Sequence, residues 1–408
     1  MKVSKFNYEF EHRSKRYVYN CLTDALFSFT HPFGNEYLEN FTDDEIERLV
    51  CNGLVVKGNY EDELTNLFLE TKKQDDEDVK YNHVVIAPSL LCNARCFYCY
   101  EESSKPSTMT EEVIEKTVEF IRQNADRSKP FSISWFGGEP ILFIGIIEKI
   151  SRALMGEYHF SASMISNGSR LTKENVLTLG ACKVKHVQLS IDGFGEVYSC
   201  RKKYADSTTF EDVVKGIENC IDSGISVALR LNIDQDNVQS ICELIDFLTQ
   251  RIHSPLLSAY PAPLYGASVL NQLSQDLELT NSVITDIMAR LKKCNMLDRK
   301  CELNSGILKY PCMAHADNSI VIDPDGFLYK CEHDVGRPEV SVGSVFTGRK
   351  QAHSDEVIPL NTKFADCYVC PLLPKCLGGC DAVRRDGELP CGILKQTLEH
   401  HILSKIGE

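Results

Sequence analysis

The stretch SLLCNARCFYCYEE, residues 89–102, carries three closely spaced cysteines, Cys92, Cys96 and Cys99. The apolar run HVVIAPS leads directly into it and is rich in the β-branched residues that favour strands. Three thiolates can occupy three corners of a metal centre, whereas structural zinc sites and fully cysteine-ligated iron–sulfur cubes use four protein ligands. The spacing therefore predicts a metal centre at the end of a strand, with one coordination position left open.

The composition limits the class of protein. A chain of 408 residues with 43% hydrophobic content can bury a large core and is expected to form two or three domains. Its net charge of −14 argues against nucleic acid as a partner, because phosphates call for a basic surface. The N-terminal residues lack the apolar core of a signal peptide, and no run reaches the roughly 18 apolar residues of a membrane span. We therefore expect a cytoplasmic protein without membrane contact.

Residues 1–78 are predicted to form a small α+β unit. The segments KFNYEFE and RYVYN, separated by the polar HRSK, favour a β-hairpin. Thr42, followed three residues later by Glu45, indicates the N-terminus of a short helix that ends near Gly53. The charged run TKKQDDEDVK (71–80) has no apolar face and predicts a linker. Removal of residues 1–78 is expected to leave the barrel predicted over residues 81–290 and its metal centres intact.

Residues 81–290 alternate predicted strands with predicted helices. Amphipathic segments such as TEEVIEKTVEFIRQN and FEDVVKGIENCIDSG separate the strands. Repeated β-then-α units imply parallel strands joined by right-handed crossovers, in either a barrel or an open sheet. Functional groups then belong at the carboxyl ends of the strands. The predicted strands are HVVIAPS, FSISWF, HFSASMIS, VKHVQLSI, SVALRLNI and LLSAYPAP.

Polar or glycine-rich segments follow these strands. WFGGEP (135–140) ends the second strand with two glycines, which allow a ligand close to the backbone. The next three strand ends offer donors for a carboxylate and partners for ribose hydroxyl groups. A single polar strand end is more often a structural cap, but five in register predict a shared site. The candidates at the third, fourth and fifth strand ends are Ser166 and Asn167, Ser190 and Asp192, and Arg230 and Asn232.

The region 291–408 has short, loop-rich segments that are dense in cysteine. A reducing cytosol disfavours disulfides, so metal is expected to supply much of the stability of this region. A zinc ribbon would use two C-x-x-C pairs, and here only Cys367 and Cys370 form one. Isolated cysteines are expected to fill space in the core; they are Cys21, Cys51, Cys182, Cys200, Cys220, Cys242 and Cys294.

The three-cysteine loop, with an aromatic residue before its last cysteine, and the GGEP segment resemble the radical S-adenosylmethionine (SAM) superfamily. The resemblance implies a partial (β/α)6 TIM-like barrel over residues 81–290. Cys92, Cys96 and Cys99 would hold a 4Fe–4S cube, and SAM would bind its open iron. An electron from a donor such as flavodoxin or ferredoxin would cleave SAM to a 5′-deoxyadenosyl radical, which abstracts hydrogen from the substrate. The implied SAM contacts are Tyr98, Gly137, Gly138, Glu139, Pro140, Ser166, Asn167, Ser190, Asp192, Arg230 and Asn232.

The spacing C-x2-C-x5-C-x3-C followed by a lone cysteine resembles the SPASM domain, expected here over residues 291–408. This resemblance implies two auxiliary 4Fe–4S clusters, and therefore three clusters in all. One would use Cys312, Cys331 and Cys380, with Cys301 as the expected fourth ligand. The ligands of the other would be Cys367, Cys370, Cys376 and Cys391. The catalytic base is left unassigned.

Enzymes of this SPASM class mostly act on peptides or proteins. The favoured hypothesis is a maturase that forms a thioether or other crosslink in a ribosomally made precursor peptide. Its N-terminal unit would bind the leader of that peptide at a strand edge. The alternative is a sulfatase-maturating enzyme that forms formylglycine, but that branch has Asp where Glu332 follows Cys331. A second alternative, an iron–sulfur electron-transfer protein, would need no barrel with a GGEP segment.

Overall fold

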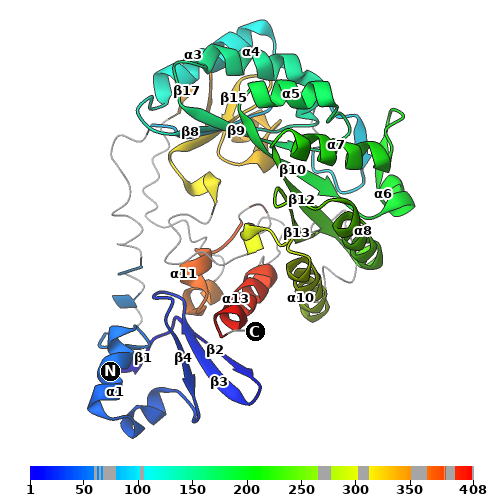
Figure 1. Cartoon of the computed structure of the whole chain (residues 1–408). Helices are drawn as coiled ribbons and strands as arrows, with labels where there is room; N and C mark the ends of the chain where they lie inside the picture. The colour runs from blue at the N-terminus through cyan, green and yellow to red at the C-terminus, as the bar shows by residue number, and fades with distance from the viewer. Residues whose placement is uncertain are drawn as a thin grey trace.

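The computed structural model describes residues 1–58, 62–63, 66–67, 80–101, 105–264, 277–301, 312–350, 365–380, 382 and 391–406. Figure 1 shows the whole chain, from the N-terminal unit (blue) to the last helix (red). The predicted linker lies outside the described residues except for Lys80. Among the described helices, none has the length and apolar character required to cross a bilayer.

A mixed sheet of ten strands runs through the described part of the chain. Six neighbouring strands of the barrel region pair in parallel, in the order β6-β8-β9-β10-β12-β13. They coincide with the six predicted strands, so the partial (β/α)6 barrel is confirmed. Their bounds are β6 (His83–Ile86), β8 (Phe131–Trp135), β9 (Phe160–Ser166), β10 (Val184–Ile191), β12 (Ser226–Ile233) and β13 (Leu257–Pro263).

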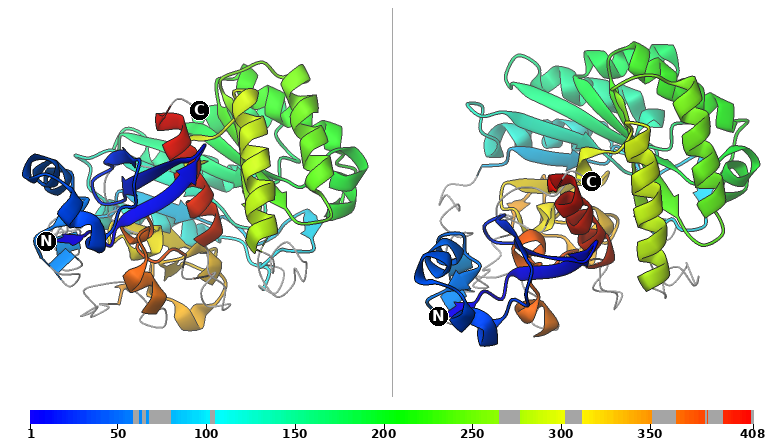
Figure 2. Two further views of the ribbon diagram at one scale, coloured as in Figure 1. Left: turned by 90° about the horizontal axis from the view of Figure 1, so that it is seen from below. Right: turned by 60° about the horizontal axis from the view of Figure 1, so that its bottom comes forward.

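Helices cover the outer face of this sheet (Figures 1 and 2). The helix after β6 begins behind Thr110, whose side chain accepts a hydrogen bond from the Val113 amide. It buries Val113, Val118 and Ile121 in the same core as Trp135 of β8, and each such aliphatic side chain contributes about 1.5–3 kcal/mol. The covering helices are α3 (Glu111–Asn124), α4 (Ile144–Leu154), α5 (Lys173–Ala181), α6 (Gly195–Arg201), α7 (Phe210–Asp222), α8 (Val238–Arg251) and α10 (Leu277–Lys293).

The region after residue 291 continues the barrel sheet. Strand β14 (Ser319–Ile322) pairs in parallel with β6, and β15 (Phe327–Tyr329) pairs antiparallel with β14. Two short antiparallel strands, β16 (Gly343–Ser344) and β17 (Gly348–Arg349), complete this extension. The short 3-10 helices of the chain are η1 (Asn35–Asn40), η2 (Pro140–Phe143), η3 (Arg299–Cys301), η4 (Met313–His315), η5 (Glu332–Asp334), η6 (Pro338–Val340) and η7 (Ala365–Val369).

The N-terminal unit contains the predicted hairpin and helix. Strands β2 (Asn7–His12) and β3 (Lys15–Asn20) form the hairpin, and β4 (Leu26–Phe29) adds a third antiparallel strand. Strand β1 (Lys2–Val3) pairs with β5 (Val55–Val56). Thr42 and Glu45 form the predicted capping box at the start of α1 (Asp43–Cys51). Both local predictions for this unit are confirmed.

The N-terminal unit packs directly against the cysteine-rich C-terminal region (Figures 1 and 2). Its partners are α11 (Leu373–Cys376) and α13 (Cys391–Lys405), and α13 also contacts α10 of the barrel. Phe6 shares an apolar cluster with Leu373 and Leu377, and Tyr19 and Cys21 share another with Leu372, Leu398 and Ile402. The Lys375 ammonium, almost fully buried, lies 2.5 Å from Asp24 Oδ1. Removal of residues 1–78 would therefore expose apolar side chains of the C-terminal region.

Candidate functional site

The three-cysteine loop is held by a two-stranded ribbon that the sequence did not predict. Strand β7 (Ala94–Cys96) pairs antiparallel with β11 (Lys202–Tyr204), with Cys96 opposite Lys202. The Cys92 sulfur accepts hydrogen bonds from the Ala94 amide at 3.3 Å and from Asn167 Nδ2 at 3.6 Å. Because N–H donors stabilise a thiolate, this environment fits a cysteine that ligates a metal centre.

No three of the described His, Cys, Asp and Glu side chains converge closely enough to hold one metal ion. In a 4Fe–4S cube each thiolate binds a different iron, so the cysteines need not converge on one point. Within the loop, Cys92 and Cys96 are partly buried and Cys99 is exposed. The donor set, three thiols on one short loop, therefore fits a cube with an open iron.

The GGEP segment is packed against the backbone that precedes Cys92. A Cβ atom on Gly137 would lie 2.4 Å from the Ser89 carbonyl oxygen, and one on Gly138 would lie 2.4 Å from that of Leu91. The Gly138 amide donates to the Ser89 oxygen at 3.1 Å, and the Glu139 amide donates to the Leu91 oxygen at 3.0 Å. The sequence suggested that these glycines open the backbone to a ligand. The structure gives them a packing role as well, because larger residues would push the cysteine loop away.

Glu139 links the end of β8 to the end of β9. Its side chain is completely buried, and burial raises the pKa of this carboxyl to about 7. The carboxylate accepts hydrogen bonds from the Asn167 amide at 2.6 Å, the Ser166 hydroxyl at 2.8 Å and the Ile141 amide at 3.3 Å. Glu139 thus fixes the position of the two polar residues predicted at the end of β9.

Replacing Glu139 by alanine is expected to lower the free energy of unfolding by about 3 kcal/mol or more. Three donors lose their acceptor in a buried site, and each unsatisfied donor costs about 1–3 kcal/mol. Urea unfolding would measure the change. Glu112→Ala, in the exposed first turn of α3, is the control and should cost less than about 1 kcal/mol. Equal losses in the two variants would contradict the role assigned to Glu139.

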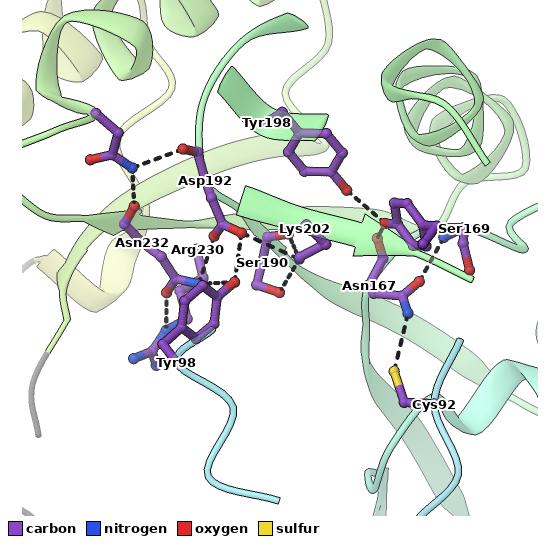
Figure 3. A network of polar contacts seen from close by, with 12 residues as sticks. Cys92, Tyr98, Asn167, Ser169, Ser190, Asp192, Tyr198, Lys202, Arg230 and Asn232 are labelled. Atoms are coloured by element: carbon purple, nitrogen blue, oxygen red, sulfur yellow. Dashed lines mark hydrogen bonds and ion pairs between the residues drawn. The ribbon is translucent and has the colours of Figure 1, made fainter. Parts of the chain in front are cut away.

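A polar network joins the cysteine loop to the ends of β10 and β12 (Figure 3). Asp192, completely buried, accepts hydrogen bonds from the Tyr98 hydroxyl at 2.6 Å and from Asn232 Nδ2 at 2.9 Å. Arg230 Nε donates to Asn232 Oδ1 at 3.1 Å. These four residues were all predicted from sequence as site residues, and the structure brings them together.

Lys202 is a buried cation that the sequence analysis missed. Its Nζ atom donates to the carbonyl oxygen and the hydroxyl of Ser190, at 2.6 and 2.8 Å, and lies 3.9 Å from Asp192 Oδ2. The side chain is 1% exposed and projects from the ribbon strand that faces Cys96 (Figure 3). Lys202 therefore places a positive charge between the cysteine loop and the Asp192 carboxylate. The only sequence pattern that could have indicated Lys202 is the strand alternation over Lys202, Lys203 and Tyr204. Three residues are too few for such an alternation to be recognised.

Other missed residues tie the same loop to β9. Asn93 accepts from Asn167 Nδ2 at 3.0 Å and donates to Asp206 Oδ2 at 2.9 Å. The Tyr204 hydroxyl donates to the Asn167 carbonyl oxygen at 2.9 Å. The segment 202–206 thus holds the cysteine loop against the strand ends.

The next feature is the set of cysteines expected to hold the first auxiliary cluster. Burial and the neighbouring thiols of Cys312 and Cys380 raise the pKa of Cys331 to about 11. Cys301 is buried in the barrel core, close enough to Tyr260 of β13 to affect its pKa. Cys331 thus lies within electrostatic range of Cys312 and Cys380, whereas Cys301 has a packed core position.

The second auxiliary set is described only in part. Burial, offset in part by a hydrogen bond from the Leu372 amide, raises the pKa of Cys370, and the neighbouring Cys367 raises it further. Cys376 ends α11, and a turn with positive φ at Leu377, Gly378 and Gly379 precedes Cys380. The Cys391 side chain lies outside the described residues.

The two cysteine groups face each other across an aromatic contact. The rings of Tyr100 and His333 stack with centroids 4.2 Å apart and an interplanar angle of 19°. Tyr100 directly follows Cys99, and His333 lies two residues after Cys331. Burial and the nearby Glu332 raise the pKa of Glu101 to about 7. Carboxyl and aromatic groups therefore lie where the three-cysteine loop meets the Cys331 loop.

The isolated cysteines range from buried to exposed, and Cys242 and Cys294 are intermediate. Cys21, Cys182 and Cys220 are buried, as expected for cysteines that fill space in a core. Cys51 and Cys200 are exposed, so the space-filling interpretation does not apply to them.

Comparison with known proteins identifies the class to which the barrel belongs. Residues 86–248 match the sequence profile of the Radical SAM superfamily. Together with the parallel sheet and the three-cysteine loop, this match identifies a radical SAM domain, which implies one 4Fe–4S cluster and SAM.

The relatives divide by how much of the chain they match. Fe-coproporphyrin III synthase of Methanosarcina barkeri is 26% identical over 204 residues, 50% of this chain and 49% of its own, so the chain spans about half its length. Mycofactocin maturase MftC of Mycolicibacterium smegmatis is 23% identical over 313 residues, 74% of this chain and 78% of its own. A serine-type anaerobic sulfatase-maturating enzyme of Klebsiella aerogenes is 21% identical over 325 residues, covering 74% and 80%.

Solved structures show the same fold. anSMEcpe with bound AdoMet and Cp18Cys peptide superposes with a TM-score of 0.60 at 18% identity, covering 79% of this chain and 97% of its own. Streptococcus suis SuiB bound to precursor peptide SuiA gives a TM-score of 0.52 at 17% identity, covering 93% and 95%. These likenesses show a shared fold, and the predicted resemblance to the Radical SAM superfamily is confirmed.

Proposed function

We propose that this protein is a radical SAM maturase that forms a thioether or other crosslink in a ribosomally made precursor peptide. The observation that carries the proposal is the network that joins Tyr98 of the three-cysteine loop to Asp192 and Asn232 at two barrel strand ends. The mycofactocin maturase relative and the likeness to SuiB, solved with its precursor peptide, support a peptide as substrate.

The residues of this chain would hold and orient the cofactors. Cys92, Cys96 and Cys99 would ligate the cluster, which together with SAM supplies a radical able to take hydrogen from an unactivated C–H bond. Asp192 presents a buried carboxylate suited to ribose hydroxyl groups. The Lys202 ammonium, close to Asp192, partly offsets the negative charge of that carboxylate and of the thiolates.

Two auxiliary clusters complete the proposal, one on Cys312, Cys331 and Cys380 with Cys301, the other on Cys367, Cys370, Cys376 and Cys391. Anaerobically reconstituted protein should then contain about twelve irons per chain, four from each cube. Cys370→Ala with Cys376→Ala should reduce this to about eight and lower solubility, because metal supports the loop-rich region. Iron analysis and thermal unfolding test both. About four irons in the intact protein would contradict the auxiliary assignment, and tightly bound zinc would indicate a ribbon instead.

The N-terminal unit would bind the leader part of the precursor. Among the described strands, β2 and β4 each pair only with β3, so both are edges to which an extended peptide could add. Fluorescence anisotropy with a labelled precursor peptide tests this role in the full chain. The isolated leader should compete for binding, and the isolated core peptide should not. Competition by the core peptide alone would contradict it.

Formylglycine formation is the second candidate, favoured by the sulfatase-maturating relative. In this chain Glu332 follows Cys331 and lies near Glu101. The two functions differ in product, because formylglycine carries an aldehyde and a crosslinked peptide does not. An aldehyde-reactive probe, applied after incubation with a sulfatase-derived peptide, would distinguish them.

A further inference from the structure

The outer face of the β7–β11 ribbon carries two cations directly opposite each other. Arg95 and Lys203 are register partners, and both side chains are exposed. Like charges at facing positions destabilise a strand pair by roughly 0.2–1 kcal/mol. Within the described residues neither side chain forms an ion pair with a carboxylate; Arg95 donates instead to the carbonyl oxygens of Cys92 and Ala94. The ribbon keeps these charges in solvent although they weaken it.

An exposed aromatic side chain, Phe97, directly follows the ribbon strand β7. Phe97, two residues after Arg95, is 45% exposed, and the Arg201 guanidinium lies 5.0 Å from its ring centroid. We call Arg95, Phe97 and Lys203 the cationic ribbon face. Arginine and aromatic residues are enriched in protein–protein interfaces. The composition of the face is therefore that of a docking surface for a protein.

The charge of the whole chain restricts the partner. With a net charge of −14, the protein repels acidic molecules at long range, so an acidic partner needs a local positive surface to orient it. This face also lies beside the loop proposed to hold the cluster, since Arg95 lies between Cys92 and Cys96 and contacts the Cys92 backbone at 2.8 Å. A partner bound to this face would be separated from that cluster only by the backbone of the ribbon.

We propose that the cationic ribbon face docks an acidic, one-electron donor protein that reduces the cluster on the three-cysteine loop. The proposal rests on the proposed function, because it requires that cluster. One electron leaves the carrier of the donor and enters the cluster, and no bond forms or breaks in this step. Transient redox encounters use small interfaces, below about 1,200 Å², and rely on charge for their association rate. A face of three residues suits such an encounter.

The test compares two reductants on the reconstituted full chain with Lys203→Glu. With reduced flavodoxin, an acidic donor, the second-order rate of cluster reduction should fall about tenfold at low ionic strength. With dithionite, which needs no docking surface, the rate and the iron content should stay close to wild type. The flavodoxin difference should vanish near 1 M salt, where screening is nearly complete.

The matched control is Lys185→Glu, which reverses an exposed charge at the other end of β10 from the site. Three results would overturn the docking proposal. The control could lose as much of the flavodoxin reduction rate as Lys203→Glu, or Lys203→Glu could leave that rate unchanged. Flavodoxin could also compete with the precursor peptide for binding. Protein without a reducible cluster would refute the proposed function as well, and its absorption spectrum would reveal this before any donor is added. Failure of docking alone would leave dithionite-driven SAM cleavage intact.

Discussion

Replacing Cys92, Cys96 and Cys99 together by alanine is expected to abolish SAM cleavage and to remove about four of about twelve irons, the content of one cube. The loop should keep its place, because Asn93, the β7–β11 pairing and the contacts of Gly137 and Gly138 do not depend on the thiols. Iron analysis and chromatographic detection of 5′-deoxyadenosine measure the two effects.

Cys182→Ala and Cys220→Ala are the controls for this triple variant, since both cysteines are buried in the barrel core away from the loop. Each should keep the full iron content and measurable cleavage, at some cost in stability. Residual cleavage in the triple variant above the level of protein without iron would mean that another group binds SAM productively.

Removing residues 1–78 is expected to disrupt the C-terminal region. The truncation exposes Leu372, Leu373, Leu377, Leu398 and Ile402, each worth about 1.5–3 kcal/mol when buried. Even part of that sum is comparable to the whole stability of a domain, about 5–15 kcal/mol. The truncated chain should aggregate, or should lose the irons assigned to Cys367, Cys370, Cys376 and Cys391. Expression yield and iron analysis measure the outcome.

A point variant tests the contact between the N-terminal unit and the C-terminal region without removing any residues. Asp24→Ala removes the carboxylate that lies 2.5 Å from the nearly buried Lys375 ammonium and that accepts from the Tyr19 hydroxyl. We expect a loss of about 3 kcal/mol in unfolding free energy. Asp44→Ala, exposed in α1, should change it by less than about 1 kcal/mol. A truncated chain that is soluble, with full iron and normal thermal stability, would show that the two regions are independent.

The parts predicted best were those with a strong local pattern. The barrel strands combine short apolar runs such as HVVI with alternating segments such as FSISW, and both patterns are typical of buried strands. The joint position of Asp192 and Asn232 followed from the rule that parallel strands share one functional edge, whereas Tyr98 was implied by the resemblance of the cysteine loop. The capping box at Thr42 was predicted from two residues with a fixed offset.

The parts not predicted depend on contacts between distant segments. The β7–β11 ribbon joins residues 94–96 to residues 202–204, and neither three-residue strand has a periodicity of its own. Lys202 therefore had no sequence signal, although it lies beside Asp192. The packing of Phe6 and Tyr19 on α11 and α13 was hidden in the same way, because an alternating strand shows that one face is buried but not what covers it.

The central claim is that a radical generated in this barrel takes hydrogen from a peptide. The most direct measurement incubates the reduced protein and SAM with a fully deuterated candidate precursor peptide and analyses both products by mass spectrometry. The account predicts one deuterium in 5′-deoxyadenosine and a peptide that has lost hydrogen in a new crosslink. Unlabelled 5′-deoxyadenosine with an unchanged peptide would contradict it.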